Sequence, residues 1–181
     1  IGVIGPTGKG TEEHFGKSLA DLVMCTFSKS FGSIGGFIAG DREVVNYIKH
    51  EGRPLIFSAS MPPANLAAAS AALKIMREEP QHVQRLQDIS SRMIREYKSL
   101  GFNIDVAETA IVPLIIGDDH LTFQFWKELF DAGIYANPVV TPGVPPGRAL
   151  IRTSYMAIHT DSELDRVLET TAKVGRRLGI I

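Results

Sequence analysis

The chain has 181 residues, of which 44% are apolar and 22% are charged, and its formal net charge is −1. This balance is typical of a folded globular protein and gives no reason to expect binding to nucleic acid or to an anionic membrane. The single cysteine, Cys25, excludes an internal disulfide and agrees with a reducing cytoplasm. No apolar run reaches the roughly 20 residues that a membrane-spanning helix requires.

The first half of the sequence predicts a loop, short strands and helices in turn. Residues 1–19 are rich in Gly, Thr and Lys and predict a loop. Short apolar runs predict three strands, at 20–27, 35–40 and 54–60. A helix is expected from Asp41, a candidate N-cap, to the stop at Gly52. Pro62 and Pro63 suit the first turn of the alanine-rich helix that follows.

The second half predicts a small layer of strands and helices. From Pro80 to Leu100, apolar residues recur at three- and four-residue steps, which indicates an amphipathic helix. Apolar runs then predict four strands, at 102–106, 110–117, 134–140 and 149–156. Helices are expected at 118–132 and from Thr160, whose spacing to Glu163 is that of a capping box. This order predicts a mainly antiparallel sheet covered by helices.

The first part of the chain resembles the margin of a larger sheet, because it has too few strands to complete one. The sequence opens with Ile rather than Met and has no basic and apolar leader. We therefore expect the chain to be the C-terminal part of a longer protein.

The glycine-rich segment Gly5–Thr11 suggests a phosphate loop, but it matches the motif poorly. In that motif four residues separate a glycine from the Gly-Lys pair, and a hydroxyl residue comes just after the lysine. Here those two positions hold Val3 and Gly10. A surface loop is the better interpretation, and nucleotide binding through Lys9 stays as a weak alternative.

Lys29 stands between two serines, after an apolar run and before a glycine-rich turn, where the chain looks buried. A buried ammonium tends to lose its proton, and the neutral amine is a nucleophile suited to a Schiff base with a carbonyl. The hydroxyls of Thr26 and Ser28 can donate to an anion such as a phosphate. On spacing alone, a lysine that reaches solvent from a strand end is slightly favoured over this chemistry.

Four segments, in the correct order, resemble the α-oxoamine synthases, which are fold-type-I enzymes dependent on pyridoxal phosphate. These are "GVIGPTGKGTEEHFG", "TFSKSFGSIGGFIAG", "RPLIFSASMPP" and "GRALIRTSYMAIHT", and the resemblance spans essentially the whole chain. It implies an α/β fold: the edge of the large-domain sheet of such a transferase, plus a C-terminal α+β small domain. The implied bounds are 1–65 for the cofactor-binding large domain and 66–181 for the connecting helix and small domain.

The resemblance implies a role for each matching residue around the cofactor, pyridoxal 5'-phosphate. Lys29 is expected to form the Schiff base and then to act as acid and base at the substrate's Cα. Thr26 and Ser28 are expected to contact the cofactor. Ser58 and Ala59 match the place where the second subunit of a homodimer contributes to the cofactor phosphate.

Arg152 matches the family's arginine that pairs with the substrate carboxylate, a role to which a guanidinium fork is well suited. The alternative is a strand arginine in a surface ion pair.

His159 and His14 are interpreted as structural, and Cys25 as core packing. No metal site is predicted. The family's D-E-A-H motif and its ring-stacking histidine are absent from the chain, so we expect the chain alone to be inactive.

The resemblance implies a cytoplasmic acyltransferase that condenses an amino acid (serine, alanine or glycine) with an acyl-CoA and releases CO2. Residues 136–160 look most like the serine palmitoyltransferase branch, which begins sphingolipid synthesis, although some members carry an arginine where Val140 stands. The 8-amino-7-oxononanoate synthases and glycine C-acetyltransferases remain alternatives. A non-catalytic regulatory subunit is the alternative from another class, and the presence of Lys29 argues against it.

Overall fold

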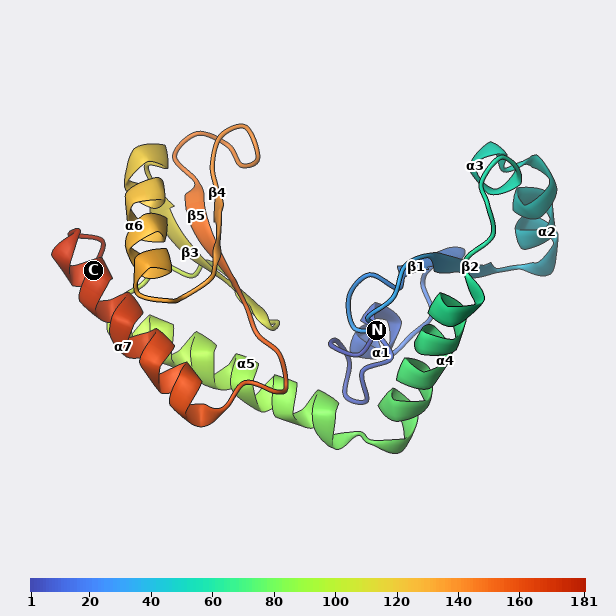
Figure 1. Ribbon diagram of the computed structural model, residues 1–181, viewed down its shortest axis with the longest axis horizontal. Helices are drawn as coiled ribbons and strands as arrows, with labels where there is room; N and C mark the ends of the chain where they lie inside the picture. The colour runs from blue at the N-terminus through green and yellow to red at the C-terminus, as the bar shows by residue number, and fades with distance from the viewer. The chain divides into compact units, whose positions relative to one another are not determined.

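A computed structural model describes residues 1–181, and the chain forms two compact units, Ile1–Val83 and Gln84–Ile181 (Figure 1). Both units combine helices with strands, so the predicted α/β class is confirmed. None of the helices combines the length and the apolar character that a bilayer crossing requires.

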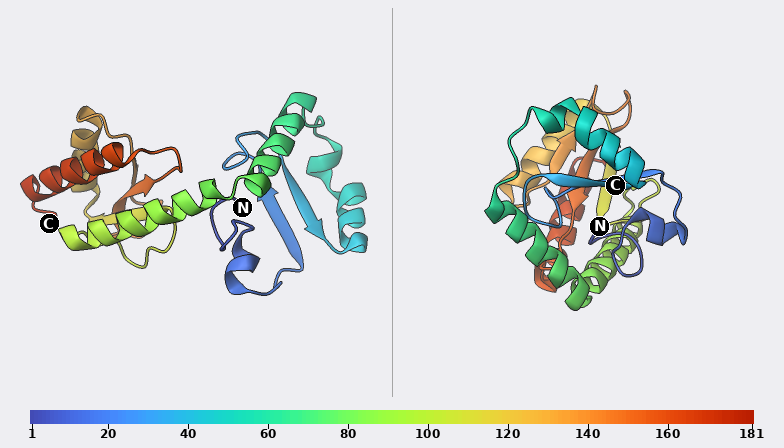
Figure 2. Two further views of the ribbon diagram at one scale, coloured as in Figure 1. Left: turned by 90° about the horizontal axis from the view of Figure 1, so that it is seen from below. Right: turned by 90° about the vertical axis from the view of Figure 1, so that its right-hand side faces the viewer.

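The first unit is built around a two-stranded antiparallel ribbon (Figure 2). β1 (Leu22–Thr26) pairs with β2 (Gly36–Gly40) along the whole length of both strands. A Cβ atom at Gly36 would lie 2.3 Å from the carbonyl oxygen of Cys25, so this end of the ribbon requires glycine. The ribbon is preceded by α1 (Thr11–Phe15), a short helix within the segment that was expected to be a loop.

Three helices follow the ribbon. α2 (Arg42–Glu51) begins after Asp41 as predicted, although the Asp41 side chain makes no capping hydrogen bond. α3 (Arg53–Ile56) lies where a strand was expected, because Pro54 suits a first helical turn and the backbone closes onto the carbonyls of Gly52 and Arg53. α4 (Pro63–Glu78) begins at its proline, as predicted.

The core of the first unit lies between the β1–β2 turn and α4. Phe27 and Phe31 are buried with their rings edge to face, 5.0 Å apart, and Ala69 of α4 is buried against them. The half-buried side chains around this cluster are Cys25, Met61, Ala72 and Met76. Cys25 therefore packs against the core, as the sequence predicted.

The second unit is an α+β layer with a three-stranded antiparallel sheet in the order β3-β5-β4. Its strands are β3 (Ile111–Gly117), β4 (Asn137–Val139) and β5 (Ala149–Ser154). Its helices are α6 (Asp119–Asp131), α7 (Asp161–Arg177) and all but the first three residues of α5 (Gln81–Leu100). α6 contacts all three strands, and ion pairs of Arg92 with Asp161 and Asp165 join α5 to α7 beside it (Figure 1).

One face of this sheet is covered and the other is open. Along β5, Ala149, Ile151 and Thr153 are buried, whereas Arg152 and Ser154 between and after them are exposed. This alternation is the period of two that a strand imposes. The predicted antiparallel sheet covered by helices is thus confirmed, and its open face carries Arg152.

One predicted strand of the second unit does not form. Phe102 and Ile104 are buried as a strand there would require, but Asp105 has a φ of 52°, which ends the extended run. Asn103 is joined to the sheet by a hydrogen bond from the Ile115 amide to its carbonyl (2.8 Å). At the other end of the unit, the capping box of Thr160 and its partner glutamate is present as predicted.

Candidate active site

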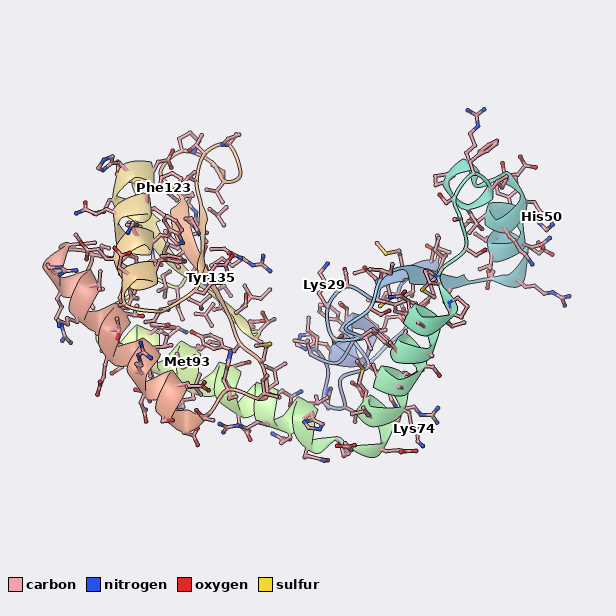
Figure 3. All side chains as sticks on the ribbon, viewed as in Figure 1. Lys29, His50, Lys74, Met93, Phe123 and Tyr135 are labelled. Atoms are coloured by element: carbon pink, nitrogen blue, oxygen red, sulfur yellow. The ribbon has the colours of Figure 1, made fainter.

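Lys29 lies in the turn that joins β1 to β2 (Figure 3). The turn is closed by backbone hydrogen bonds from the Phe27 amide to the Gly35 carbonyl and from the Ser33 amide to the Phe27 carbonyl, both 2.9 Å. The Gly32 amide also donates to the Lys29 carbonyl (2.9 Å). Gly32 and Gly35 have φ angles of 59° and 94°, so glycine allows the chain to fold back within a few residues of the lysine.

The turn brings together three side chains that the sequence singled out. The hydroxyl oxygens of Thr26 and Ser28 lie 2.8 Å apart, and the Ser28 amide donates to the Thr26 hydroxyl (3.3 Å). The Lys29 Nζ atom donates to the Ser28 hydroxyl at 3.3 Å. One amine and two hydroxyls thus form a single polar cluster, able to hold a carbonyl covalently and to donate hydrogen bonds to an anion.

Lys29 itself is exposed, as the alternative of a lysine that reaches solvent predicted, although the chain around it looked buried from the sequence. The apolar residues around it supply the reason. Phe27 and Phe31 turn inward and are only 9% and 5% exposed, which leaves the lysine between them on the outer side of the turn. The amine is therefore open to a ligand that carries a carbonyl.

The first residues of the chain lie against this turn, a contact that the sequence did not predict. The Ser30 hydroxyl donates to the carbonyl of Ile1 (2.6 Å). A Cβ atom at Gly2, whose φ is 78°, would lie 2.9 Å from the Cβ of Ser30. No pattern in the sequence reports this contact, because it joins residues 29 positions apart through one hydroxyl.

The glycine-rich loop at residues 5–11 is closed by a side chain of the chain itself. The Glu13 carboxylate accepts hydrogen bonds from the Thr7 hydroxyl (2.5 Å) and from the amides of Thr7 and Lys9 (3.0 Å each). The Thr7 hydroxyl is the main cause that lowers the pKa of Glu13. Because a carboxylate already occupies these donors, the loop is not arranged as a phosphate site, in agreement with the sequence.

Ser58 and Ala59 lie in the exposed segment between α3 and α4. They form no hydrogen bond with the cluster of Thr26, Ser28 and Lys29 within this chain. Phe57, immediately before them, is 84% exposed. The structure therefore does not bring these two residues to Lys29 through a contact of the chain with itself.

Arg152 belongs to the second unit, where it pairs across the sheet with Pro113 on β3 and Asn137 on β4. Its side chain is exposed on the open face and has no ion pair or hydrogen bond within the chain. The alternative of an arginine in a surface ion pair is thus wrong. An unpaired guanidinium in a strand is available for an anionic ligand.

Two cavities are lined by residues that the sequence analysis or the fold singled out. A cavity of about 660 Å³ beside the β1–β2 ribbon is lined by Thr26, Gly35 and Gly36 together with apolar side chains of α2 and α3, but not by Lys29. A cavity of about 300 Å³ in the second unit is lined by residues that include Tyr155 and His159. No group of three or more His, Cys, Asp or Glu side chains is arranged to hold a metal ion.

Comparison with known proteins identifies the family. Residues 6–170 match the family model described as aminotransferase class I and II. An 8-amino-7-oxononanoate synthase from Thermosipho melanesiensis is 44% identical over an alignment of 181 positions that covers 99% of this chain and 46% of the relative. A serine palmitoyltransferase from Sphingobacterium spiritivorum is 42% identical over 99% of this chain and 45% of the relative. The chain thus spans about half the length of the curated relatives it matches.

A solved structure described as SPT with a PLP internal aldimine shares the fold, with a TM-score of 0.94 and 32% sequence identity. The match covers 100% of this chain and 46% of that one. The resemblance to the α-oxoamine synthases, first suggested by four motifs, is confirmed by these relatives. The chain belongs to the aminotransferase class I and II family.

Proposed function

We propose that the protein is a pyridoxal-phosphate-dependent acyltransferase, which condenses an amino acid with an acyl-CoA and releases CO2. The observation that carries this proposal is the cluster of Thr26, Ser28 and Lys29 in a chain of this family. Serine palmitoyltransferase, and with it the first step of sphingolipid synthesis, is the preferred activity. The chain's match to the SPT structure and to a serine palmitoyltransferase supports this choice.

The residues of the β1–β2 turn fit pyridoxal 5'-phosphate. When bound, this cofactor supplies an electron sink that stabilises negative charge on the substrate's α-carbon. Lys29 offers an exposed amine that can hold the cofactor covalently, and the hydroxyls of Thr26 and Ser28 offer donors for its phosphate or ring. The similar SPT structure is described as containing PLP, which supports the same cofactor here.

Lys29 also moves the substrate's proton. The Lys29 amine would take a proton from the α-carbon and return one later, and the bound cofactor would supply the electron sink for the charge that this leaves. The Ser28 hydroxyl, 3.3 Å from the Lys29 Nζ atom, orients the amine during this transfer.

Arg152 holds the substrate carboxylate. Its guanidinium has no acidic partner in the chain and stands on the open face of the sheet. Two parallel hydrogen bonds from a guanidinium match the two oxygens of a carboxylate, which fixes the orientation of the amino acid.

The active form is a cytoplasmic homodimer with a shared active site. The exposed segment that contains Phe57, Ser58 and Ala59 supports this arrangement, because it is open to a partner and forms no hydrogen bond with the Lys29 cluster of its own chain. Ser58 and Ala59 then contribute to the cofactor phosphate of the partner. The domain bounds 1–65 and 66–181 remain a prediction about the whole enzyme, whereas the two compact units describe packing within this chain.

A second candidate activity is that of 8-amino-7-oxononanoate synthase, because a relative with this name is 44% identical. Glycine C-acetyltransferase is a further alternative within the same chemistry. Assays with serine, alanine and glycine, each against palmitoyl, pimeloyl and acetyl thioesters, separate these three activities.

Borohydride reduction tests the central claim. In the full-length protein loaded with pyridoxal phosphate, borohydride is expected to fix the cofactor to the peptide that contains Lys29, detected by mass spectrometry. The Lys29→Ala variant should lose the label, while Lys9→Ala, which changes the other lysine of a glycine-rich loop, should keep it. A label on Lys9, or no label on any lysine, contradicts the proposal.

A further inference from the structure

Two buried tyrosine hydroxyls join the strand that carries Arg152 to helix α5. Tyr155 directly follows β5, and its hydroxyl donates to the hydroxyl of Tyr97 at 3.0 Å. Tyr97 is fully buried and Tyr155 is 8% exposed. Burial raises the pKa of both phenols, so both stay protonated at neutral pH. A buried polar pair of this kind favours one arrangement of the core over its alternatives.

Further hydrogen bonds fix the same end of the sheet. The buried Thr153 hydroxyl donates to the carbonyl of Val112 on β3 (2.7 Å), and the Tyr155 amide donates to the carbonyl of Ala110 (3.0 Å). A one-residue slip of β5 would break these contacts and turn Arg152 toward the covered face, because side chains alternate along a strand. The hydroxyls on the covered face therefore determine which residues appear on the open face.

Arg85 of α5 holds the turn that follows β5. Its Nη2 atom donates to the carbonyl of His159 (3.2 Å) and to the carboxylate of Asp161 (2.8 Å). Within the turn, the Met156 amide donates to the His159 Nδ1 atom (3.2 Å), and the His159 amide donates to the Met156 carbonyl (3.1 Å). His159 is thus used as a structural group, as the sequence predicted, and α5 supports the turn from outside.

We propose that Tyr97, Tyr155 and Arg85 are positioning residues for Arg152. They act on the covered side and at the C-terminal end of β5, where they keep the strand in register and its last residues ordered. Arg152 then meets the substrate carboxylate in one orientation, without contact between these three residues and the substrate. This inference rests on the proposed role of Arg152 in carboxylate binding.

Two variants test it in the full-length protein loaded with pyridoxal phosphate. Tyr155→Phe removes one buried hydroxyl but keeps the ring, and Arg85→Ala frees the turn. Each is expected to raise the apparent Kd of the amino acid by about fivefold, less than the loss of Arg152 itself, because β5 still pairs on both sides. The KM for acyl-CoA should not change. In the cofactor-free protein, amides of residues 151–156 should exchange faster with solvent.

Matched controls separate positioning from a general loss of stability. Thr122→Val removes a buried hydroxyl of the same unit, which donates to the Asp118 carbonyl (2.7 Å) at the start of α6 and not to β5 or the turn after it. Arg177→Ala removes an arginine that pairs with Glu128 between two helices. Both should leave the amino-acid Kd and the exchange of residues 151–156 unchanged.

The outcomes are distinct. If Arg152→Ala weakens amino-acid binding while Tyr155→Phe and Arg85→Ala do not, the positioning role is wrong and the proposed function stands. If the controls weaken binding as much as Tyr155→Phe and Arg85→Ala do, the effect is one of stability and the positioning role is again wrong. If Arg152→Ala changes nothing, the proposed role of Arg152 fails and this inference fails with it.

Discussion

At the scale of single residues, the proposed function depends on the exposed amine of Lys29 and on the two hydroxyls beside it. Spacing and motif selected Lys29, Thr26 and Ser28, and the structure joins the three by hydrogen bonds. On spacing alone, a lysine that reaches solvent was slightly favoured, although the apolar flanks made this part of the chain look buried, and the exposed Lys29 side chain agrees with the favoured alternative. Lys29 is exposed because the turn directs Phe27 and Phe31 inward. A sequence pattern does not predict the direction of side chains in such a turn.

Arg152 offers the clearest test among single residues. A charge-assisted hydrogen bond contributes about 1.5–3 kcal/mol, so Arg152→Ala should weaken binding of the amino acid about 10- to 150-fold at about 1.4 kcal/mol per decade. Arg152→Lys should restore only part of the affinity, because an ammonium cannot pair with both carboxylate oxygens in one plane. Absorbance titration of the loaded enzyme with serine, alanine and glycine measures these affinities. Equal affinities in wild type and Arg152→Ala would remove Arg152 from the site.

At the scale of elements, the sequence predicted the long helices and the paired strands well. A regular apolar stripe along the sequence predicted helices such as α5 and α7, and the capping box predicted where α7 begins. The short helices α1 and α3 were missed. α3 formed in place of a strand because a proline in a first turn and closing backbone hydrogen bonds outweigh apolar composition in a segment with no partner strand. At 102–106, one residue with positive φ was enough to end the extended run.

The caps of α2 and α6 give a matched pair of substitutions. Asp118 caps α6 through a hydrogen bond from the Leu121 amide (2.7 Å), whereas Asp41 precedes α2 without such a bond. Asp118→Ala should lower the local stability of α6 by about 1 kcal/mol, while Asp41→Ala should change α2 much less. Amide exchange in the first turn of each helix measures both effects. Equal losses for the two variants would mean that charge near the helix start, not the capping hydrogen bond, sets the stability.

The loop that precedes β1 should respond to acid. The pKa of Glu12 is lowered, chiefly by the Ala20 amide, and that of Glu13 chiefly by the Thr7 hydroxyl. Both carboxylates therefore stabilise the folded loop above their unfolded pKa, for which the ordinary value is 4.5, and this contribution is lost as the pH falls through the folded pKa.

Amide exchange of residues 5–20, followed between pH 7 and pH 3 and corrected for intrinsic rates, checks this expectation. Protection should fall in the acid range in wild type. In the Glu13→Gln variant, residues 5–11 should be poorly protected already at pH 7 and respond less to acid. Protection that is independent of pH in wild type would show that these carboxylates do not hold the loop.

At the scale of the whole molecule, the two units differ in how much apolar surface they bury. The fully buried large side chains, among them Tyr97, Phe125 and Met93, all belong to the second unit. The first unit buries mainly Phe27, Phe31 and Ala69. The sequence predicted only that the first part of the chain has too few strands for a complete sheet and that the second part forms a sheet covered by helices. The degree of burial could not be predicted, because it depends on contacts between distant segments.

The 181-residue chain, expressed alone, should therefore fold unevenly and catalyse nothing. Residues 84–181 are expected to form a cooperative, protected unit, while residues 1–83 should show low amide protection and early cleavage by trypsin, because side chains such as Phe57 (84% exposed), Met24 (72%) and Tyr47 (69%) lack cover. No condensation product should form from any amino acid and acyl-CoA, since Lys29 would lie in the less stable unit. The full-length protein, assayed in parallel, provides the positive control. Uniform protection across both units would contradict the stability argument, and measurable condensation by the chain alone would contradict the expectation that its activity needs residues beyond these 181.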